Sequence, residues 1–366
     1  MFNISGMIKL DVIYDAGVTS GDRIDYTNIT TDNPKGQVRI HARESRLNIS
    51  TSQDILGKRY TTILEGDFYA GGSNSPVNSE NISNASSFRL RHAYMSYGQW
   101  LAGQTWSNYV DVKSFPETLD FSNDTGQSFI RQGQIRYSHS TEHLIFSYSI
   151  ENPETDVDFT ETGLDSTDAK SDPSIDPIFD FTAKAKYQSA WGHLSLQNVL
   201  RKHKVQTDSN SLSEIGYGLG VSGKTQLTPQ DLIKFHYSQG IGIGRYIQEA
   251  AGAAGILTQS LSATHSEFDL MLLEAKGGYL SYQHTFNETL RVNMSSGFMD
   301  IDYPSMDTQN AFNSNTKTLT SFHSNIIWSV TPHMEAGIEY SQVNLIKVSG
   351  AQGNIKRFQL STKIRF

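Results

Sequence analysis

The feature of this sequence that most restricts its fold is an alternation of apolar and polar residues with a period of two. Near the end of the chain, Phe358, Leu360 and Ile364 fall on one face of an extended strand, and Arg357 and Lys363 fall on the other. This pattern is typical of a strand with one apolar and one polar side. It recurs in sixteen segments, near residues 6–14, 37–52, 58–69, 87–97, 99–105, 129–138, 143–151, 179–188, 192–204, 214–226, 231–241, 268–286, 289–300, 316–329, 333–344 and 354–366. We therefore predict an all-β chain.

The connections between these segments are alternately short and long. Short connections such as 139–142 and 287–288 alternate strictly with long ones such as 70–86 and 242–267. Strict alternation predicts antiparallel hairpins, with tight turns at one rim and long loops at the other. A transmembrane antiparallel β-barrel of the bacterial outer membrane has this arrangement, with an even number of strands, short periplasmic turns and long extracellular loops. We predict a single barrel of about 16 strands over residues 1–366.

Composition agrees with a barrel around an aqueous channel. Hydrophobic residues make up 37% of the 366 residues, below the roughly 45–50% of ordinary globular domains. About sixteen strands enclose water instead of a dry core, and strands in lipid must close so that every backbone group is paired. The longest apolar stretches, such as 250–257, are far shorter than the roughly 18 residues of a spanning helix. A soluble β-sandwich or β-propeller would also alternate, but the many Arg and Lys residues on the polar faces and the lack of a four-strand repeat favour the barrel.

Charge and cysteine usage exclude several other classes of protein. The formal net charge is −8, and residues 151–180 hold ten acidic residues and one lysine, with no dense basic run elsewhere. Binding of nucleic acid is therefore not expected. The chain has no cysteine, which removes disulfides, thiol catalysis and cysteine-based zinc sites. We predict no cofactor and no metal site. Because Met1 leads directly into patterned sequence, we expect a mature chain with an added methionine.

Four neighbouring stretches carry a resemblance to a known family. They are SFRLRHAYMSY at Ser87–Tyr97, WLAGQTWSNY at Trp100–Tyr109, FPETLDF at Phe115–Phe121 and IRQGQIRYS at Ile130–Ser138. This run resembles the DcaP-like porins, which are trimeric outer-membrane channels of Gram-negative bacteria. The terminal Phe366 on an alternating strand is similar to the signal that the outer-membrane assembly machinery reads. The resemblance implies a sixteen-stranded barrel in the outer membrane, a homotrimer, and uptake of small anionic solutes such as dicarboxylates. Some members carry an N-terminal helical extension before the barrel, which this sequence does not show.

The segment 106–128 is the third long connection, and it follows the fifth predicted strand. In porin-like barrels the third long loop folds into the lumen and narrows it. We therefore expect a constriction loop here, against the alternative of an ordinary outward loop. Its acidic candidates are Asp111, Glu117 and Asp120.

The wall opposite this loop is expected to present the charges that select solutes. An arginine on the lipid face costs roughly 2–4 kcal/mol at the bilayer midplane, so the cations of the polar faces are assigned to the lumen. Rings of Arg favour anions, and one guanidinium can bind a carboxylate through two parallel hydrogen bonds. The candidate pore-lining residues are Arg43, Arg46, Arg89, Arg91, Arg131 and Arg136. A bulge after Ala42 would let the first two face inward together. Alternatively, these cations pair with neighbouring acids such as Glu44, Glu65 and Asp67 and only keep the wall hydrated.

The acidic extracellular loop predicted at 152–178 supports two interpretations. Asp156, Asp158 and Glu161 could bind calcium through oxygen ligands, but they lack the ordered spacing and the glycine of a known calcium loop. A solvated loop is favoured, and divalent ions could bridge its charge to lipopolysaccharide.

Other function classes find little support. No G-x-S-x-G, H-E-x-x-H or P-loop motif is present, and no plug domain precedes the first strand. We therefore expect a passive channel for small hydrophilic solutes that prefers anions, instead of an enzyme or a plugged receptor. A general or cation-preferring porin gated by its acidic loops is the remaining alternative.

Overall fold

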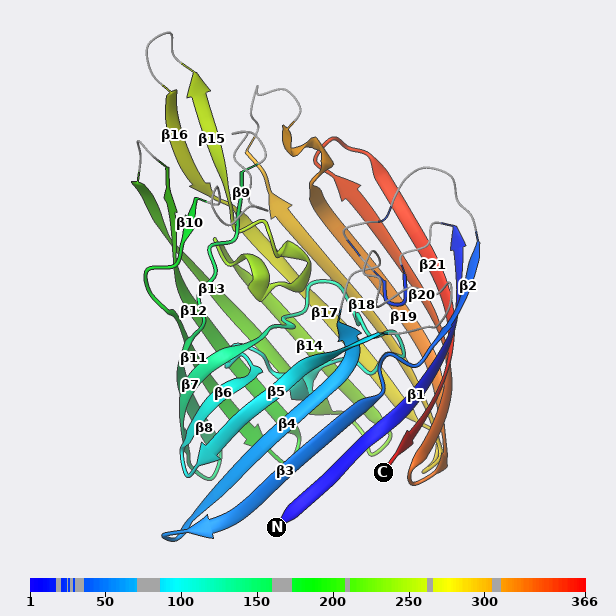
Figure 1. The fold of residues 1–366 in the computed structure, drawn as a ribbon. Coiled ribbons are helices and arrows are strands. Elements are labelled where there is room, and N and C mark those ends of the chain that lie inside the picture. The colour runs from blue at the N-terminus through cyan, green and yellow to red at the C-terminus, as the bar shows by residue number, and fades with distance from the viewer. Residues whose placement is uncertain are drawn as a thin grey trace.

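The described residues form a closed antiparallel β-barrel, which confirms the fold predicted from the alternating pattern (Figure 1). The computed structural model describes residues 1–17, 21–24, 26, 29, 36–70, 86–159, 173–207, 211–261, 266–304 and 311–366. Within these ranges the wall contains sixteen strands, when β2 and β3 are counted as one. The two chain termini lie at the end of the barrel that carries the tight turns (Figure 1).

The wall strands follow one another around the barrel in chain order. They are β1 (Phe2–Gly17), β2 (Gln37–His41) with β3 (Arg46–Ile55), β4 (Lys58–Ala70), β5 (Ser87–Tyr97), β6 (Trp100–Trp106), β7 (Arg131–Ser140), β8 (Leu144–Glu151), β11 (Asp180–Ser189), β12 (Gly192–Gln206), β13 (Ser211–Gln226), β14 (Asp231–Ile241), β17 (Glu274–Thr285), β18 (Leu290–Asp302), β19 (Thr316–Thr331), β20 (Met334–Lys347) and β21 (Gln352–Arg365). The first strand pairs with β21, which closes the sheet. Closure leaves no free strand edge, as lipid requires.

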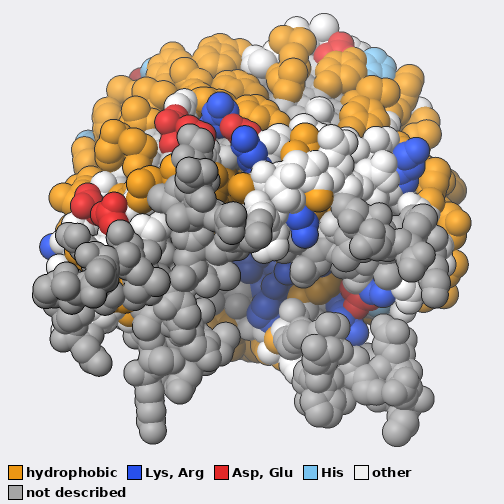
Figure 2. Space-filling model, turned by 90° about the horizontal axis from the view of Figure 1, so that it is seen from above, with side chains coloured by type: hydrophobic (Ala, Val, Ile, Leu, Met, Phe, Trp, Pro, Cys, Tyr) orange, Lys and Arg blue, Asp and Glu red, His pale blue; other side chains and the backbone are white. Residues whose placement is uncertain are grey.

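The strands place apolar side chains outside the barrel and polar side chains inside it. In β21, Phe358, Leu360 and Ile364 are about half exposed on the outer surface, whereas Arg357 and Gln359 are buried. Viewed from above, apolar side chains cover the outside of the wall (Figure 2). The period-two pattern of the sequence therefore records which side of the wall each residue faces.

The second predicted strand, 37–52, is interrupted. Both β2 and β3 pair with β1, and residues 42–45 leave the ladder in a turn in which the Ser45 amide donates to the Ala42 carbonyl at 3.0 Å. Even-numbered residues face outward in β2, whereas Leu47 faces outward in β3. The predicted change of face thus occurs through a turn between two short strands, and not through a bulge.

The predicted strand 268–286 contains a boundary between two strands. Its first part is β16 (Ser266–Leu272), which pairs with β15 (Gly255–Leu261) in a small sheet separate from the barrel wall. In that sheet β15 also pairs with the short parallel strand β9 (Val157–Asp158). Between β16 and β17, the Leu273 amide donates to the Ala254 carbonyl at 2.9 Å, which turns the chain back into the wall. The short strand β10 (Ser174–Ile175) extends the ladder of β12.

The remaining described elements are short. They are the 3-10 helices η3 (Val112–Ser114), η5 (Gly244–Tyr246), η6 (Gln248–Ala250) and η7 (Ala311–Ser314). Among the residues described, no helix has the length and apolar character needed to cross a membrane.

An apolar cluster fills part of the barrel at the end with the long loops. Buried Ile24 and Tyr26 of the first long connection belong to it, together with Ile243 and Ile256 and with side chains at the upper ends of β18 to β21. Within the apolar stretch 250–257, Ala250 and Ile256 are buried in this cluster, whereas Ala251 and Gly252 are exposed. Burial of this kind stabilises by roughly 25 cal/mol per Å² of apolar surface, so these connections are held in the mouth of the barrel.

Candidate functional site

The segment between β6 and β7, residues 107–130, runs inside the barrel (Figure 1). We call it the inner loop. Its polar atoms bond to inward-facing side chains on strands far from β6 and β7, from β11 around to β21 and β1. Because these contacts reach across the lumen, the inner loop divides the interior into a part facing the long loops and a part facing the tight turns.

Asp111 fixes the first part of the inner loop to three neighbouring strands. Its Oδ1 lies 2.8 Å from Lys186 Nζ of β11, and its Oδ2 lies 2.5 Å from His193 Nε2 of β12. The Ser222 hydroxyl of β13 donates to the same Oδ2 at 3.1 Å. Asp111 is 5% exposed, so its charge is compensated by the wall and is not presented to the lumen.

Glu117 makes the second contact with the wall. Arg291 of β18 donates to both of its carboxylate oxygens, at 2.8 and 2.7 Å, and Gln283 of β17 donates to Oε2 at 2.8 Å. The same guanidinium donates to Glu335 of β20 at 2.9 Å. A bidentate pair of this kind fixes geometry as well as charge.

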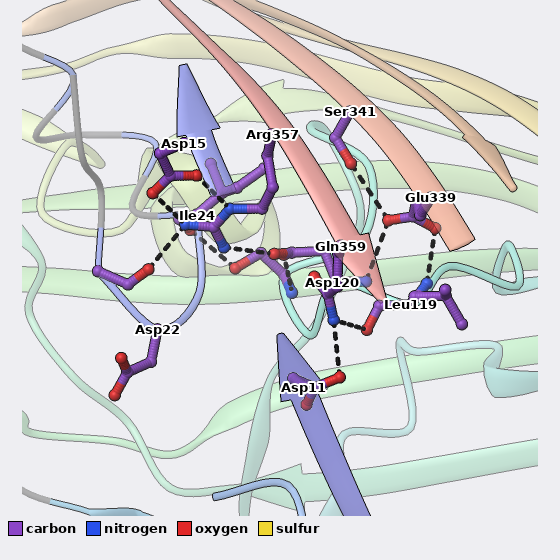
Figure 3. A network of polar contacts seen from close by, with 12 residues as sticks. Asp11, Asp15, Asp22, Ile24, Leu119, Asp120, Glu339, Ser341, Arg357 and Gln359 are labelled. Atoms are coloured by element: carbon purple, nitrogen blue, oxygen red, sulfur yellow. Dashed lines mark hydrogen bonds and ion pairs between the residues drawn. The ribbon is translucent and has the colours of Figure 1, made fainter. Parts of the chain in front are cut away.

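Asp120 lies in the third contact, which joins the inner loop to the first and last strands (Figure 3). Arg357 of β21 donates to Asp120 at 2.7 Å and to both carboxylate oxygens of Asp15 in β1, at 2.7 and 2.9 Å. The amides of Leu119 and Asp120 donate to Glu339 of β20, at 2.6 and 3.0 Å. Arg357, Asp120 and Glu339 are all buried, so this network excludes water while it positions the loop.

The far end of the inner loop passes directly against the wall backbone. Gly126 has a φ of +79°, and a Cβ there would lie 2.0 Å from the Phe298 carbonyl oxygen and 2.4 Å from the Gly278 nitrogen. No other residue type fits this approach without moving a strand. The adjacent Thr125 amide donates to Ser321 Oγ at 2.9 Å, which completes the path of the loop along β17 to β19.

Glu249, in η6 of a long connection, covers this end of the loop. Its side chain is 5% exposed, Oε2 accepts the Gly126 amide at 2.9 Å, and Oε1 has no hydrogen-bond partner among the described residues. Burial raises the pKa of Glu249 to about 8, although the hydrogen bond from Gly126 acts in the opposite direction. The carboxyl is therefore largely neutral at pH 7 in the folded protein.

The raised pKa of Glu249 makes the stability of the folded protein depend on pH. An unfolded Glu loses its proton near its ordinary value of 4.5, whereas folded Glu249 keeps it up to about 8. Stability should thus fall as pH rises from about 4.5 to about 8. Glu249→Gln keeps an acceptor without titrating, so its melting temperature in detergent should fall a few degrees less between pH 5 and pH 9 than that of the unmodified chain. Glu288→Gln, at an exposed tight turn, is the control, and equal falls for all three proteins would contradict this account.

Four of the predicted arginines come together on one side of the lumen, and we call Arg46, Arg89, Arg91 and Arg131 the arginine wall. Arg89 donates to both oxygens of Asp67, at 2.9 and 2.7 Å. Arg91 bridges Glu65 at 2.9 Å and Asp67 at 2.8 Å. Arg46 Nε lies 3.7 Å from Glu65, and its other acidic neighbour, Glu44 at 3.9 Å, is also paired with Lys9.

The arginine wall faces aromatic side chains of the inner loop and of the last residue of β6. Arg89 and Arg91 lie over the ring of Phe121, at 5.3 and 5.9 Å from its centroid. Arg131, the first residue of β7, lies over Trp106 at 4.2 Å and over Phe129 at 5.1 Å. It forms no ion pair with an acid in the described part of the chain. Cation–π contacts leave the guanidinium charge in place, so the wall keeps a positive field beside the loop.

The other two predicted arginines lie elsewhere. Arg43, in the turn between β2 and β3, is paired with Asp22. Arg136 of β7 donates to Gln134 at 2.9 Å and to the Trp106 carbonyl at 3.0 Å. Within the described ranges Arg136 has no ion-paired acid, but it is separate from the group around Asp67.

The calcium interpretation of the acidic connection has no support from the described residues, which contain no group of three His, Cys, Asp or Glu side chains arranged for a metal ion. Asp156 Oδ2 instead accepts the Arg245 amide at 3.0 Å. Glu161 lies outside the described residues, as does the rest of the segment 160–172 of the predicted acidic loop.

The comparisons with known proteins agree with this architecture. The family model described as DcaP outer membrane protein matches residues 2–366. The chain belongs to the DcaP family. It is therefore an outer-membrane channel of a Gram-negative bacterium and not an enzyme, as the sequence predicted.

Solved structures of porins resemble this DcaP-family chain along its whole length. The outer membrane channel DcaP of Acinetobacter baumannii is 21% identical, with a TM-score of 0.82 over 100% of this chain and 97% of that one. OmpF of Salmonella typhi (12%, TM-score 0.61) and OmpT of Vibrio cholerae (8%, TM-score 0.60) each match 100% of this chain and 97% of their own. At such identities the likeness concerns the fold. No curated protein sequence matches the chain.

Several residues that position the inner loop of this DcaP-family barrel were not singled out as candidates from the sequence. Lys186, His193, Arg291, Glu339 and Arg357 each bind the loop. All five lie on polar faces of alternating strands. In the sequence, such a residue stands out only as a charged residue on a polar face among Ser, Gln and Asn. This pattern does not show which atom of the inner loop the residue binds.

Proposed function

We propose that this DcaP-family channel passes small hydrophilic solutes by passive diffusion and prefers anions, dicarboxylates among them. The arginine wall is the observation that carries the proposal. Four guanidinium groups stand against the carboxylates of Glu65 and Asp67, which leaves an excess of positive charge beside the inner loop. Rings of cations in a narrow aqueous pore favour anions, and arginine suits the two oxygens of a carboxylate.

We further propose that the inner loop is the constriction and that its carboxylates hold it in place. Asp111, Glu117 and Asp120 are each bound by a cation of the wall. Their negative charges are thereby compensated, so they oppose the passage of an anion only weakly. Under this proposal the solute passes beside the arginine wall, whose guanidinium groups lie against Phe121 and Phe129 of the inner loop.

The resemblance to DcaP-like porins supports a homotrimer, which we propose as the working assembly in the lipid bilayer, with lipopolysaccharide around it. Native mass spectrometry of the detergent-extracted protein distinguishes three chains from one. A mass of about 120 kDa is expected from the 40.8 kDa chain.

Uptake into liposomes tests the preference for solutes. Liposomes containing the channel should swell faster in succinate than in a neutral sugar of similar size, and slowest in a divalent cation such as an alkyl diamine. Equal rates for all three solutes would indicate a general pore. Fastest uptake of the diamine would support the alternative of a cation-preferring porin governed by its acidic loops.

A further inference from the structure

A second basic region lies inside the barrel, between the inner loop and the tight turns. It surrounds a cavity of about 1260 Å³ that is lined by the inner loop and by the lower ends of β11 to β18. Lys113, Lys224, Lys234 and Arg291 all line this cavity. The arginine wall does not, so the two basic regions lie at different depths in the lumen.

Three of these cations come from different parts of the chain. Lys224 of β13 and Lys234 of β14 are directly opposite each other in the ladder between the two strands. Lys113 belongs to η3 of the inner loop, which packs against β13 and β14. The fold therefore gathers three ammonium groups around one space. We call Lys113, Lys224 and Lys234 the lysine vestibule.

The lysine vestibule lacks a carboxylate in direct contact with it among the described residues. In the part of the chain that the structure describes, none of its three lysines forms an ion pair. Glu117, an acid in the cavity lining, is occupied by Arg291, and Glu142 is largely exposed beside His143 at the rim. Asp111 is occupied by Lys186 and His193, as described above.

The register makes this arrangement unusual. Like charges directly opposite each other on adjacent strands destabilise a sheet, yet Lys224 and Lys234 occupy such positions and are half-buried. Ammonium groups are point charges with three rotatable donors each, so together they suit a small oxyanion that carries two charges.

We propose that the lysine vestibule is a binding site for small divalent oxyanions on the periplasmic side of the inner loop, separate from the arginine wall. A bound dianion would offset the repulsion between Lys224 and Lys234 and accept hydrogen bonds from the three ammonium groups. This proposal rests on the channel function of the chain and not on the arginine wall. Because the site lies on one side of the inner loop, the channel should respond differently to dianions added from its two sides.

Sulfate is a suitable probe because it is fully divalent at neutral pH. Single channels inserted in a known direction carry a chloride current, and sulfate is added to one chamber at a time. Sulfate from the periplasmic side should reduce the chloride current at a lower concentration than sulfate from the extracellular side. The triple variant Lys113→Gln, Lys224→Gln, Lys234→Gln should raise the half-blocking concentration on the periplasmic side roughly tenfold. The single variant Lys224→Gln should give a smaller rise.

Two controls separate this site from the proposed function. Lys202→Gln removes one positive charge from the exposed outer face of β12 and should leave the block unchanged. Arg89→Gln with Arg91→Gln should alter ion selectivity but keep the stronger block from the periplasmic side. The proposal is overturned if the unmodified channel is blocked equally from both sides, or if the triple variant conducts normally and is blocked as strongly as the unmodified channel.

Discussion

Replacing both Arg89 and Arg91 by glutamine is expected to remove most of the anion preference of the channel. Each guanidinium is paired with a carboxylate that stays behind, since Arg89 and Arg91 share Asp67 and Arg91 also binds Glu65. The double variant therefore leaves only Arg46 and Arg131 against those two acids. The ratio of chloride to potassium permeability in 0.1 M salt should fall roughly threefold or more, because charges in the lumen are screened only beyond about 10 Å at that concentration.

A charge-balanced variant shows whether net charge or the arginine side chains set the selectivity. Adding Glu65→Gln and Asp67→Asn to the double variant restores the original net charge of the group, so the permeability ratio should recover substantially. Arg59→Gln with Arg365→Gln is the matched control, because both arginines are exposed near the tight turns and paired with acids. If the double variant keeps its full preference for chloride, the arginine wall is not the filter.

Replacing Arg357 by methionine is expected to produce the largest loss of stability. Its guanidinium is fully buried and binds Asp15, Asp120 and the Gly21 carbonyl. Removing one partner of a buried ion pair leaves the other charges uncompensated and costs about 3–5 kcal/mol. Urea unfolding in detergent micelles measures this loss. The inner loop would also lose the ion pair between its Asp120 and β21, so single-channel currents should become noisier and larger.

Two further variants test that explanation. Lys356→Met removes the neighbouring cation from the exposed outer face of the same strand, and it should not reduce stability measurably. Adding Asp15→Asn and Asp120→Asn to Arg357→Met removes the two uncompensated charges and should recover part of the loss. Equal losses for the Arg357 and Lys356 variants would show that the buried network does not stabilise the barrel.

The wall of the barrel could be predicted from the sequence because each strand carries its own evidence. A strand between lipid and water must alternate, so Phe358, Leu360 and their neighbours indicate both the strand and its orientation. The prediction was inaccurate where that local rule fails. The turn at 42–45 replaces part of the second predicted strand. The irregular segment 268–286 joins a strand of the small separate sheet to a strand of the barrel wall.

The arrangement of the inner loop could not be predicted in this way. Its path depends on single pairs such as Asp120 with Arg357, which are 237 positions apart in the chain. Nothing in the local pattern around Arg357 distinguishes a residue that binds a loop from one that meets water. The acids Glu65 and Asp67, which the sequence offered as partners of the wall cations, do bind Arg89 and Arg91. That both arginines share Asp67 could not be predicted, because the ladder between β4 and β5 shifts register after Glu65.

Resemblance narrowed the function but did not identify the residues that act. It directed attention to the third long connection and to the arginines opposite it, and four of those six arginines lie together. It gave no indication that Arg43 pairs with Asp22. The lysine vestibule could not be predicted from the sequence either, because its lysines meet only where β13, β14 and η3 surround one cavity.

The reversal potential of the purified channel in a planar bilayer under a gradient of KCl tests the central claim most directly. The arginine wall predicts a reversal potential displaced toward the equilibrium potential of chloride, with a displacement that shrinks as the salt concentration rises and screening increases. A reversal potential displaced toward that of potassium, at low salt and in correctly folded protein, would contradict the account.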